Sequence, residues 1–188
     1  MVKLKPIILA ALLLELSLAR AQEFSVSNPP PGYAWVFIPN TSTAVLRPED
    51  WFVTARTNNG TIACFITHEN LQVTGQFQTG LTFNFVPKVS QTAGLSAIRY
   101  AAAFIQEAQQ TKEVLLEPWV NESAPGLFGM GIRYRQETED SPVIVHNFLI
   151  ADDLEDSIRL FIFESPETNW DAAWKVGEVL MRVEISRD

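Results

Sequence analysis

The sequence predicts an α+β fold: a single domain with a mainly antiparallel β-sheet flanked by helices. Three observations support this class. Segments in which apolar and polar residues alternate are joined by short turns, which suits antiparallel pairing. Two segments with helical periodicity, one in the middle of the chain and one at its end, divide and close the series of strands. The length of 188 residues fits one domain.

The composition excludes several classes of protein. Hydrophobic residues make up 47% of the chain and charged residues 19%, which is enough apolar surface for a folded core. The net charge of -8 disfavours a surface that binds nucleic acid. A single cysteine and two histidines exclude a disulfide framework, a thiolate zinc site and an iron-sulfur cluster. We therefore expect no cofactor.

The first 21 residues have the pattern of a signal peptide. Lys3 and Lys5 precede a short apolar run, and Ala19-Arg20-Ala21 provides small residues for cleavage after Ala21. The run is shorter than the ~20 residues of a membrane-spanning helix, so an uncleaved helix at the membrane surface is the alternative. We expect an extracytoplasmic protein, periplasmic or secreted, or lumenal in a photosynthetic host, with no transmembrane anchor after cleavage.

The mature chain is expected to begin with a proline-rich lead-in at residues 22–32, followed by a single α+β domain at residues 33–188. Residues 33–39 form a short apolar run that predicts an edge strand. Further strands are predicted at residues 81–86, 128–136, 143–151 and 157–163, with a weaker one at 114–119.

Asn59 and Gly60 are the strongest turn signal in the sequence, because Asn-Gly suits the two central positions of a type I′ hairpin. They join predicted strands at residues 51–57 and 61–68. With this turn the facing pairs are Thr57 with Ile62, Ala55 with Cys64, Val53 with Ile66 and Trp51 with His68. The shared face is apolar, so Cys64 is expected to be a buried, inert thiol and not a nucleophile.

The helix at residues 95–111 places apolar side chains on one side and polar ones on the other. A closing helix follows residue 166, where Thr168 and Asp171 are spaced as a capping box. Its apolar stripe consists of Trp170, Ala173, Trp174, Gly177 and Met181.

We expect Trp51, Trp170 and Trp174 to serve as packing residues. Trp35 and Trp119 lie near predicted sheet edges, where aromatic residues also contact partners.

The sequence contains no marked catalytic constellation. His146 alternates with apolar residues along one strand, so a core or interface histidine is expected rather than a general base or a ligand, and His68 is interpreted likewise. Gly126, Gly129 and Gly131 lead into a strand and do not form a phosphate-binding motif. Catalytic residues are therefore not assigned.

Two further groups of residues have a weak functional reading. An acidic segment could supply several carboxylate oxygens to a metal ion; it contains Asp152, Asp153, Glu155 and Asp156. Its spacing differs from that of a calcium-binding loop, so we prefer a solvated loop to a metal site. Asn-x-Ser/Thr triplets at Asn40, Asn59 and Asn121 would accept sugars only in a eukaryotic secretory pathway.

One strand presents an unusual face. Opposite its apolar side, the strand at residues 128–136 reads Gly129, Gly131, Arg133 and Arg135. These residues predict a shallow strip with few side chains that ends in two guanidinium groups. It is a candidate partner-binding surface, which could accept the backbone of a partner or an anionic group. An ordinary solvent face, with glycines placed for twist or a bulge, is the alternative.

Several segments together resemble the PsbP-like superfamily, which includes the photosystem II extrinsic protein, bacterial periplasmic relatives and a Ran-binding relative. They are Arg47-Pro48-Glu49-Asp50-Trp51, the helix after Phe85, the strand that carries His146, and the segment from Phe161 to Trp170 that leads into a helix. The resemblance spans about residues 33–185. It implies an α/β/α sandwich around an antiparallel sheet and a non-enzymatic role in binding or assembly, and it assigns no catalytic residue.

The functional hypothesis is an exported, non-enzymatic accessory protein that acts through contact with a protein partner in the cell envelope or lumen. Two alternatives remain open. The 12 Phe and 5 Trp suggest a carrier for a small apolar ligand such as a lipid. A hydrolase that uses a histidine of the sheet is the other.

Overall fold

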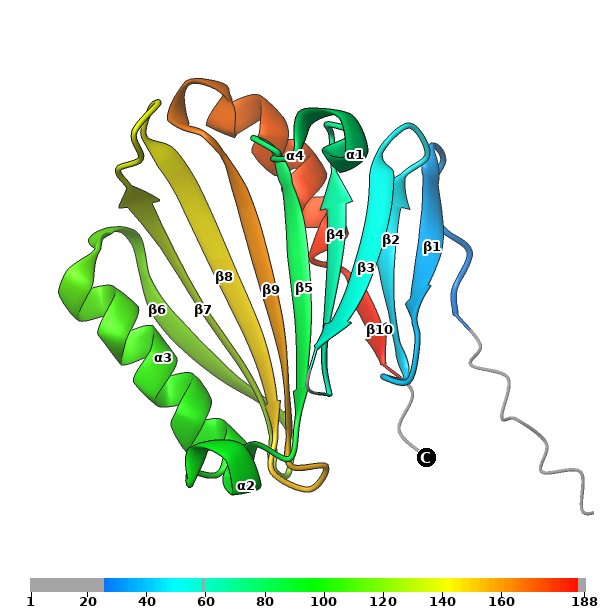
Figure 1. Cartoon of the computed structure of the whole chain (residues 1–188). Coiled ribbons are helices and arrows are strands. Elements are labelled where there is room, and N and C mark those ends of the chain that lie inside the picture. Colours follow the sequence, from blue (N-terminus) through cyan, green and yellow to red (C-terminus); the bar gives the residue numbers. More distant parts are fainter. Residues whose placement is uncertain (1–25, 59, 186–188) are drawn as a thin grey trace, which may run out of the picture.

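The computed structural model describes residues 26–58 and 60–185, and within them the chain forms two antiparallel sheets with helices against them (Figure 1). A seven-stranded sheet has the order β3-β4-β5-β9-β8-β7-β6, and a three-stranded sheet has the order β1-β2-β10. The strands of the large sheet are β3 (Phe52–Asn58), β4 (Thr61–Thr67), β5 (Gly80–Pro87), β6 (Glu113–Ala124), β7 (Leu127–Gln136), β8 (Val143–Asp152) and β9 (Ser157–Pro166). Those of the small sheet are β1 (Tyr33–Ile38), β2 (Thr43–Pro48) and β10 (Val183–Ile185). The predicted α+β class is confirmed.

The predicted hairpin is present with the predicted register. Thr57 pairs with Ile62, Ala55 with Cys64 and Val53 with Ile66. Beyond the last backbone pair, the Trp51 and His68 rings meet edge to face at 5.9 Å. Asn58 pairs with Thr61, and Gly60 in the turn between them has φ of +81°, a conformation that glycine adopts without strain.

One face of the large sheet is covered by α3 (Ala97–Thr111), which the short α2 (Val89–Ala93) precedes. Ser96 caps α3 by accepting a hydrogen bond from the Arg99 amide. The buried side of α3 packs on β6 to β9, as the amphipathic pattern predicted. In Figure 1 this helix crosses the sheet on the side of β6, β7 and β8 and leaves the β3 to β5 side free.

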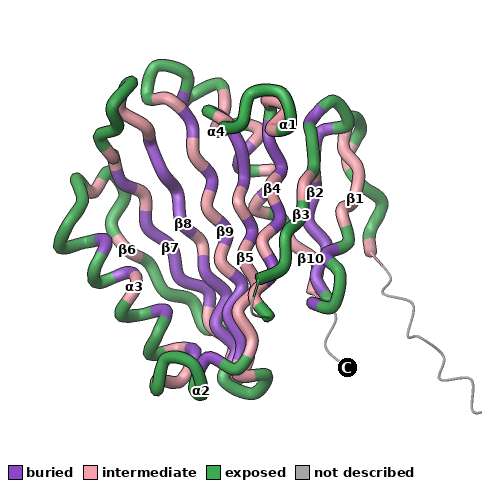
Figure 2. The backbone as a smooth tube through the Cα atoms, viewed as in Figure 1, coloured by how far each residue is buried: buried purple, intermediate pink, exposed green. Residues whose placement is uncertain are grey.

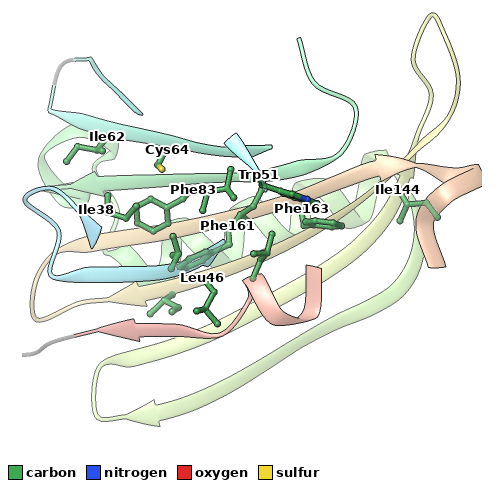
Figure 3. Packing of buried hydrophobic residues seen from close by; sticks show 14 of the residues in the cluster. Ile38, Leu46, Trp51, Ile62, Cys64, Phe83, Ile144, Phe161 and Phe163 are labelled. Carbon is green, nitrogen blue, oxygen red and sulfur yellow. The ribbon is translucent and has the colours of Figure 1, made fainter. Parts of the chain in front are cut away.

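The opposite face carries the small sheet and α4 (Trp170–Leu180), with the largest apolar cluster between the layers (Figure 3). Cys64 lies in this cluster and is 1% exposed, which confirms its predicted burial. The interior between the layers is filled by side chains, among them Leu46, Phe83, Phe161 and Phe163.

Some elements differ from the sequence prediction. Thr168 and Asp171 do not form a capping box, because residues Glu167–Asn169 form a 3-10 turn and α4 starts at Trp170 without a side-chain cap. β2, β10 and the short helices α1 (Leu71–Thr74) and α2 were not predicted. Nearly all of β2 is buried, so its residues lack the alternation that marks a half-buried strand.

The expected signal peptide lies outside the described residues. In the part of the chain that is described, no helix is long and apolar enough to cross a membrane.

Candidate functional site: an aromatic patch on the α4 face

The predicted strip lies on the face of the large sheet that also carries α4. Each residue of the strip pairs with one residue of β8: Gly129 with Ile150, Gly131 with Phe148, Arg133 with His146, and Arg135 with Ile144. The strip is not an open track, however, because aromatic side chains from β6 and α4 occupy it. The prediction of a surface with few side chains was therefore wrong in its geometry.

Trp119 of β6 fills the strip at Gly131. Because Gly131 has no side chain, the indole of Trp119 lies directly against β7 and reaches the ring of Phe148 on β8. The two rings stack at 5.6 Å with an angle of 26° between their planes. A Cβ at Gly131 would lie 2.6 Å from the indole. The glycine is thus required for this contact, at a place where the pairing of β6 with β7 is also irregular.

The aromatic contacts continue across the sheet. Phe148 stacks on Phe161 of β9 at 5.6 Å, and Phe161 contacts Phe83 of β5 at 5.0 Å. Trp119 is the outer end of this row and is 38% exposed, whereas Phe83 and Phe161 are buried in the core. The exposed indole is therefore held by a rigid series of rings.

Arg133 lies against the two tryptophans of α4. Its guanidinium carbon is 4.2 Å from the ring centre of Trp174 and 4.9 Å from that of Trp170, and these two rings stack on each other at 5.2 Å. Burial lowers the pKa of Arg133, while Glu178 nearby opposes this shift. The guanidinium remains protonated at neutral pH. Its buried Nε makes no hydrogen bond with the described residues.

His146 lies beside Arg133 beneath α4. The imidazole is 6% exposed and packs on Trp174 at 4.6 Å. Burial, and secondarily the positive charge of Arg133, lowers the pKa of His146 to about 4. The ring is a core histidine, as predicted, but its Nδ1 lacks a hydrogen-bond partner among the described residues.

Arg135 is occupied by carboxylates. It forms ion pairs with Glu113 at 3.4 Å, Glu167 at 3.1 Å and Glu137. The hydrogen bond to Glu167 is the main reason that the pKa of Arg135 is raised. These contacts join the start of β6, the β7–β8 turn and the 3-10 turn before α4, so Arg135 has a structural role and its guanidinium is not free for an anion.

The side chains that remain accessible form a compact surface, which we call the aromatic patch: Leu116, Trp119, Arg133, Phe148 and Trp174. The exposed members are Leu116 and Trp119 on β6, and the other three are half-buried. Figure 2 shows β6 largely exposed beside the more buried β7 and β8. Tryptophan and arginine side chains held on a rigid support are the residue types that dominate the binding energy of protein–protein contacts.

The two residues best suited to nucleophilic chemistry are far apart. Cys64 lies on β4 and His146 on β8, with β5 and β9 between them, which is about 14 Å at the spacing of strands in a sheet. Burial raises the pKa of Cys64 to about 11. His68 was expected to be a core or interface residue like His146; instead its side chain is 64% exposed beside Glu69. It follows the end of β4, where the chain turns outward into the loop before α1.

The acidic turn between β8 and β9 has protein partners for its carboxylates. Asp152 accepts hydrogen bonds from the Leu154 and Glu155 amides, and Asp153 accepts one from the first turn of α3. Asp156 accepts two from Ser90 at the start of α2. These acids fix the turn against two helices, and no group of three metal-binding side chains occurs in the described part of the chain.

Glu155 pairs with Arg159 at 2.9 Å. Arg159 is 1% exposed. It also donates hydrogen bonds to the Thr41 carbonyl, just before β2, and to Thr43 Oγ1, at the start of β2. Sequence analysis missed this residue, although a charge inside the apolar alternation of β9 was a signal for it. The arginine connects the large sheet to the small one.

Two of the three Asn-x-Ser/Thr triplets lie in the described chain. Asn40 is exposed in the β1–β2 turn and Asn121 is exposed on β6, whereas Asn59 lies outside the described residues.

Comparison with known structures shows which proteins share this fold. No protein-family profile and no curated protein matches the sequence. The fold is that of the PsbP class: the solution structure of cyanobacterial PsbP (CyanoP) from Synechocystis sp. PCC 6803 aligns with a TM-score of 0.55. The alignment covers 86% of this chain and 98% of that chain at 12% sequence identity. This agrees with the fold that the sequence resemblance implied.

Two other solved structures align less closely. A protein from Bacteroides thetaiotaomicron VPI-5482 gives a TM-score of 0.42 at 12% identity, over 78% of this chain and 46% of that one. A protein of unknown function from Pseudomonas aeruginosa, described as a putative regulator, gives 0.42 at 10% identity, over 83% and 98%.

Proposed function

We propose that this protein is an exported accessory protein without catalytic activity, and that it binds a protein partner through the aromatic patch. The observation that carries the proposal is Trp119, a large apolar side chain that is exposed at a sheet edge yet fixed in place on Gly131. Arg133 lies beside it with its guanidinium face against Trp174. A rigid anchor of this kind loses little conformational entropy on binding.

Three further features support the proposal. The PsbP fold agrees with the non-enzymatic role that the sequence resemblance implies. Cys64 and His146 are buried and separated, and His146 faces a cation rather than a carboxylate. The charged amino terminus, apolar run and small residues before Gln22 support export.

The binding surface can be tested by quantitative capture of partners from the native envelope. The variant Leu116→Ser/Trp119→Ser removes the exposed part of the patch, and Val73→Ser is the matched control, because Val73 is 81% exposed on α1. We expect one partner to be lost with the double variant and retained with the control. Removing a tryptophan hot spot costs about 2 kcal/mol or more, which is roughly a thirtyfold loss of affinity. Equal recovery of every partner by both variants would disprove the proposal.

Export has its own test. The mature protein purified from the native host should begin at Gln22, so its intact mass should lack residues 1–21. A full-length mass in the envelope fraction would support the uncleaved surface helix, and recovery from the cytoplasm alone would contradict export.

A further inference from the structure

A cavity of about 280 Å³ opens on the opposite face of the molecule from the aromatic patch. It lies at the end of the large sheet, where the loop between α1 and β5 faces the turn between β7 and β8, at the top of the sheet in Figure 1. Its walls include Gln76, Phe77 and Gln78 from the first segment, Gln136 and Asp140 from the second, and Glu164 from β9. These lining residues were not among the candidates found in the sequence.

Glu164 is the unusual residue of this cavity. It pairs across the sheet with Gly80 and Val145, so its side chain lies on the α3 face, opposite Phe163 and Ser165. Burial raises its pKa. Within residues 26–58 and 60–185 its side chain makes no hydrogen bond or ion pair, whereas Glu155 and Glu167 on either side of it in the chain both pair with arginines.

The polar groups around Glu164 leave its carboxylate unneutralised. Tyr134 is near enough to interact electrostatically with Glu164, and its hydroxyl accepts a hydrogen bond from Asn147 at 3.3 Å, but no hydrogen bond joins the hydroxyl to the Glu164 carboxylate. Asp140 adds a second acid to the wall, and no Lys, Arg or His is among the described residues that line the cavity. Glu164 is half-buried, and a carboxylate partly withdrawn from water without a partner is unfavourable, so a bound cation would relieve this cost.

One arginine approaches from another side. Phe77 and Glu164 also line a neighbouring cavity of about 290 Å³, whose wall includes Arg56 on β3. The guanidinium of Arg56 lies over the ring of Phe65 at 5.9 Å and forms no ion pair with Glu164. Lys112 does not line the cavity, but its Nζ donates to Gln136 Oε1 at 3.3 Å, so this amide oxygen already has a cationic partner. The first cavity therefore combines the carboxylates of Glu164 and Asp140 and the amides of Gln76 and Gln78 with one aromatic wall. These features suit a ligand that carries several N–H donors and a positive charge.

We propose that this cavity binds a guanidinium or alkylammonium group, with Glu164 as its principal acceptor and the side-chain amides of Gln76 and Gln78 as secondary ones. The group could belong to an arginine or lysine side chain of a polypeptide or to a free small amine, because both present the same cation to the carboxylate. The site does not depend on the proposed function, since it lies on the other face of the sheet. Loss of either site leaves the other intact.

The test uses butylguanidine as the ligand and butylurea as an uncharged molecule of similar shape. NMR follows the side-chain amides of Gln76, Gln78 and Gln136 and the carboxyl carbon of Glu164 during each titration. We expect saturable shifts with butylguanidine only, together with a fall in the pKa of Glu164 on saturation. Equal responses to both compounds, or no saturable response to butylguanidine, would overturn the proposal.

Glu164→Gln keeps the shape of the side chain and removes its charge, and it should weaken butylguanidine binding by about tenfold or more. Glu107→Gln, an exposed acid on α3, is the matched control and should bind as the parent does. If Glu164→Gln did not fold, Asp140→Asn on the exposed turn would replace it and should show a smaller loss. Undiminished binding by the Glu164 variant would refute the role of this carboxylate.

A blocked Ala-Arg-Ala peptide distinguishes the two sources of the cation. Binding of the peptide more than about tenfold tighter than butylguanidine supports a polypeptide side chain as the natural ligand. Binding of the small amine that equals or exceeds that of the peptide supports a free amine.

Discussion

His146 shows at the scale of one residue how burial on the α4 face affects stability. Its ring lies under Trp174 and beside Arg133, and Glu178 is the acid that acts on Arg133 from α4. The folded-state pKa of about 4 lies below the ordinary value of 6.5, so the unfolded chain binds a proton more readily between these two values. The free energy of unfolding should therefore increase with pH from about 4 to 6.5 and receive no further contribution above that range.

We predict that His146→Phe removes this contribution. The full effect at low pH is about 3 kcal/mol, since each pKa unit corresponds to about 1.4 kcal/mol. Phenylalanine retains the ring contact with Trp174 and eliminates the unpaired Nδ1. Urea unfolding of the parent and the variant between pH 4 and 7 measures the difference, and identical pH dependence in the two proteins would show that His146 does not titrate as described.

Cys64 provides a second prediction for a single residue. Its raised pKa and its place in the core predict that a thiol reagent at pH 8 modifies the folded protein only through unfolding. The rate of modification should rise by several orders of magnitude in 8 M urea. Fast modification of the native protein would mean that the β3–β4 hairpin opens locally. His68 provides a contrast, because it directly follows the same strand and its side chain is exposed.

At the scale of an element, the edge strand β6 depends on the glycines of β7. Trp119 can reach Phe148 only because Gly131 leaves space over the strand between them. Sequence analysis identified the glycines as a possible binding strip and identified Trp119 as a possible contact residue. It did not connect the two, because the pairing of β6 with β7 includes register shifts around Leu116 and Trp119 that residue spacing does not reveal.

We predict that Gly131→Ala displaces the indole of Trp119 and destabilises the protein by about 1 to 3 kcal/mol. The matched control is Gly129→Ala, where the new Cβ would lie 3.3 Å from Phe148 and 3.7 Å from Trp119. That variant should cost less than about 1 kcal/mol, because the neighbouring ring has to move only slightly. Chemical denaturation and the NMR signal of the Trp119 indole N–H measure both effects. Equal behaviour of the two variants would contradict the packing over Gly131.

At the scale of the whole molecule, Arg159 joins the two sheets. It lies on β9 in the middle of the large sheet and donates hydrogen bonds to Thr41, just before β2, and to Thr43, the first residue of β2, while Glu155 balances its charge. The ring of Phe85 lies 5.4 Å from the guanidinium and completes its surroundings. The buried arginine therefore determines how β2 sits on the core.

We predict that Arg159→Ala destabilises the protein by about 3 to 5 kcal/mol, because it leaves buried polar groups without partners. Glu155→Gln should cost less, about 1 to 3 kcal/mol, because its amide still accepts a hydrogen bond from the guanidinium but no longer neutralises the buried charge. Denaturant titrations compare the two variants. A similar small effect for both would show that the link between the sheets is not held by Arg159.

Local sequence patterns were sufficient for much of this fold. Strict alternation in β5 and β7, the Asn-Gly turn before β4 and the amphipathic period of α3 encode their own secondary structure, because each reflects which side chains meet a single apolar surface. The same reasoning placed Cys64 in the core, and the order of strands and helices indicated the α+β class. The PsbP-like fold was implied by the resemblance of several segments to that superfamily.

Contacts between distant segments depended on the complete tertiary structure. The pairing of β5 with β9, the small sheet that unites β2 with β10, and the cavity around Glu164 all join residues far apart in the chain. Such contacts follow from the simultaneous packing of every layer, so no periodicity within one segment records them. For this reason the sequence identified Arg133 and the glycines as unusual, whereas only the folded chain revealed that tryptophans cover them and that Glu164 has no partner among the described residues.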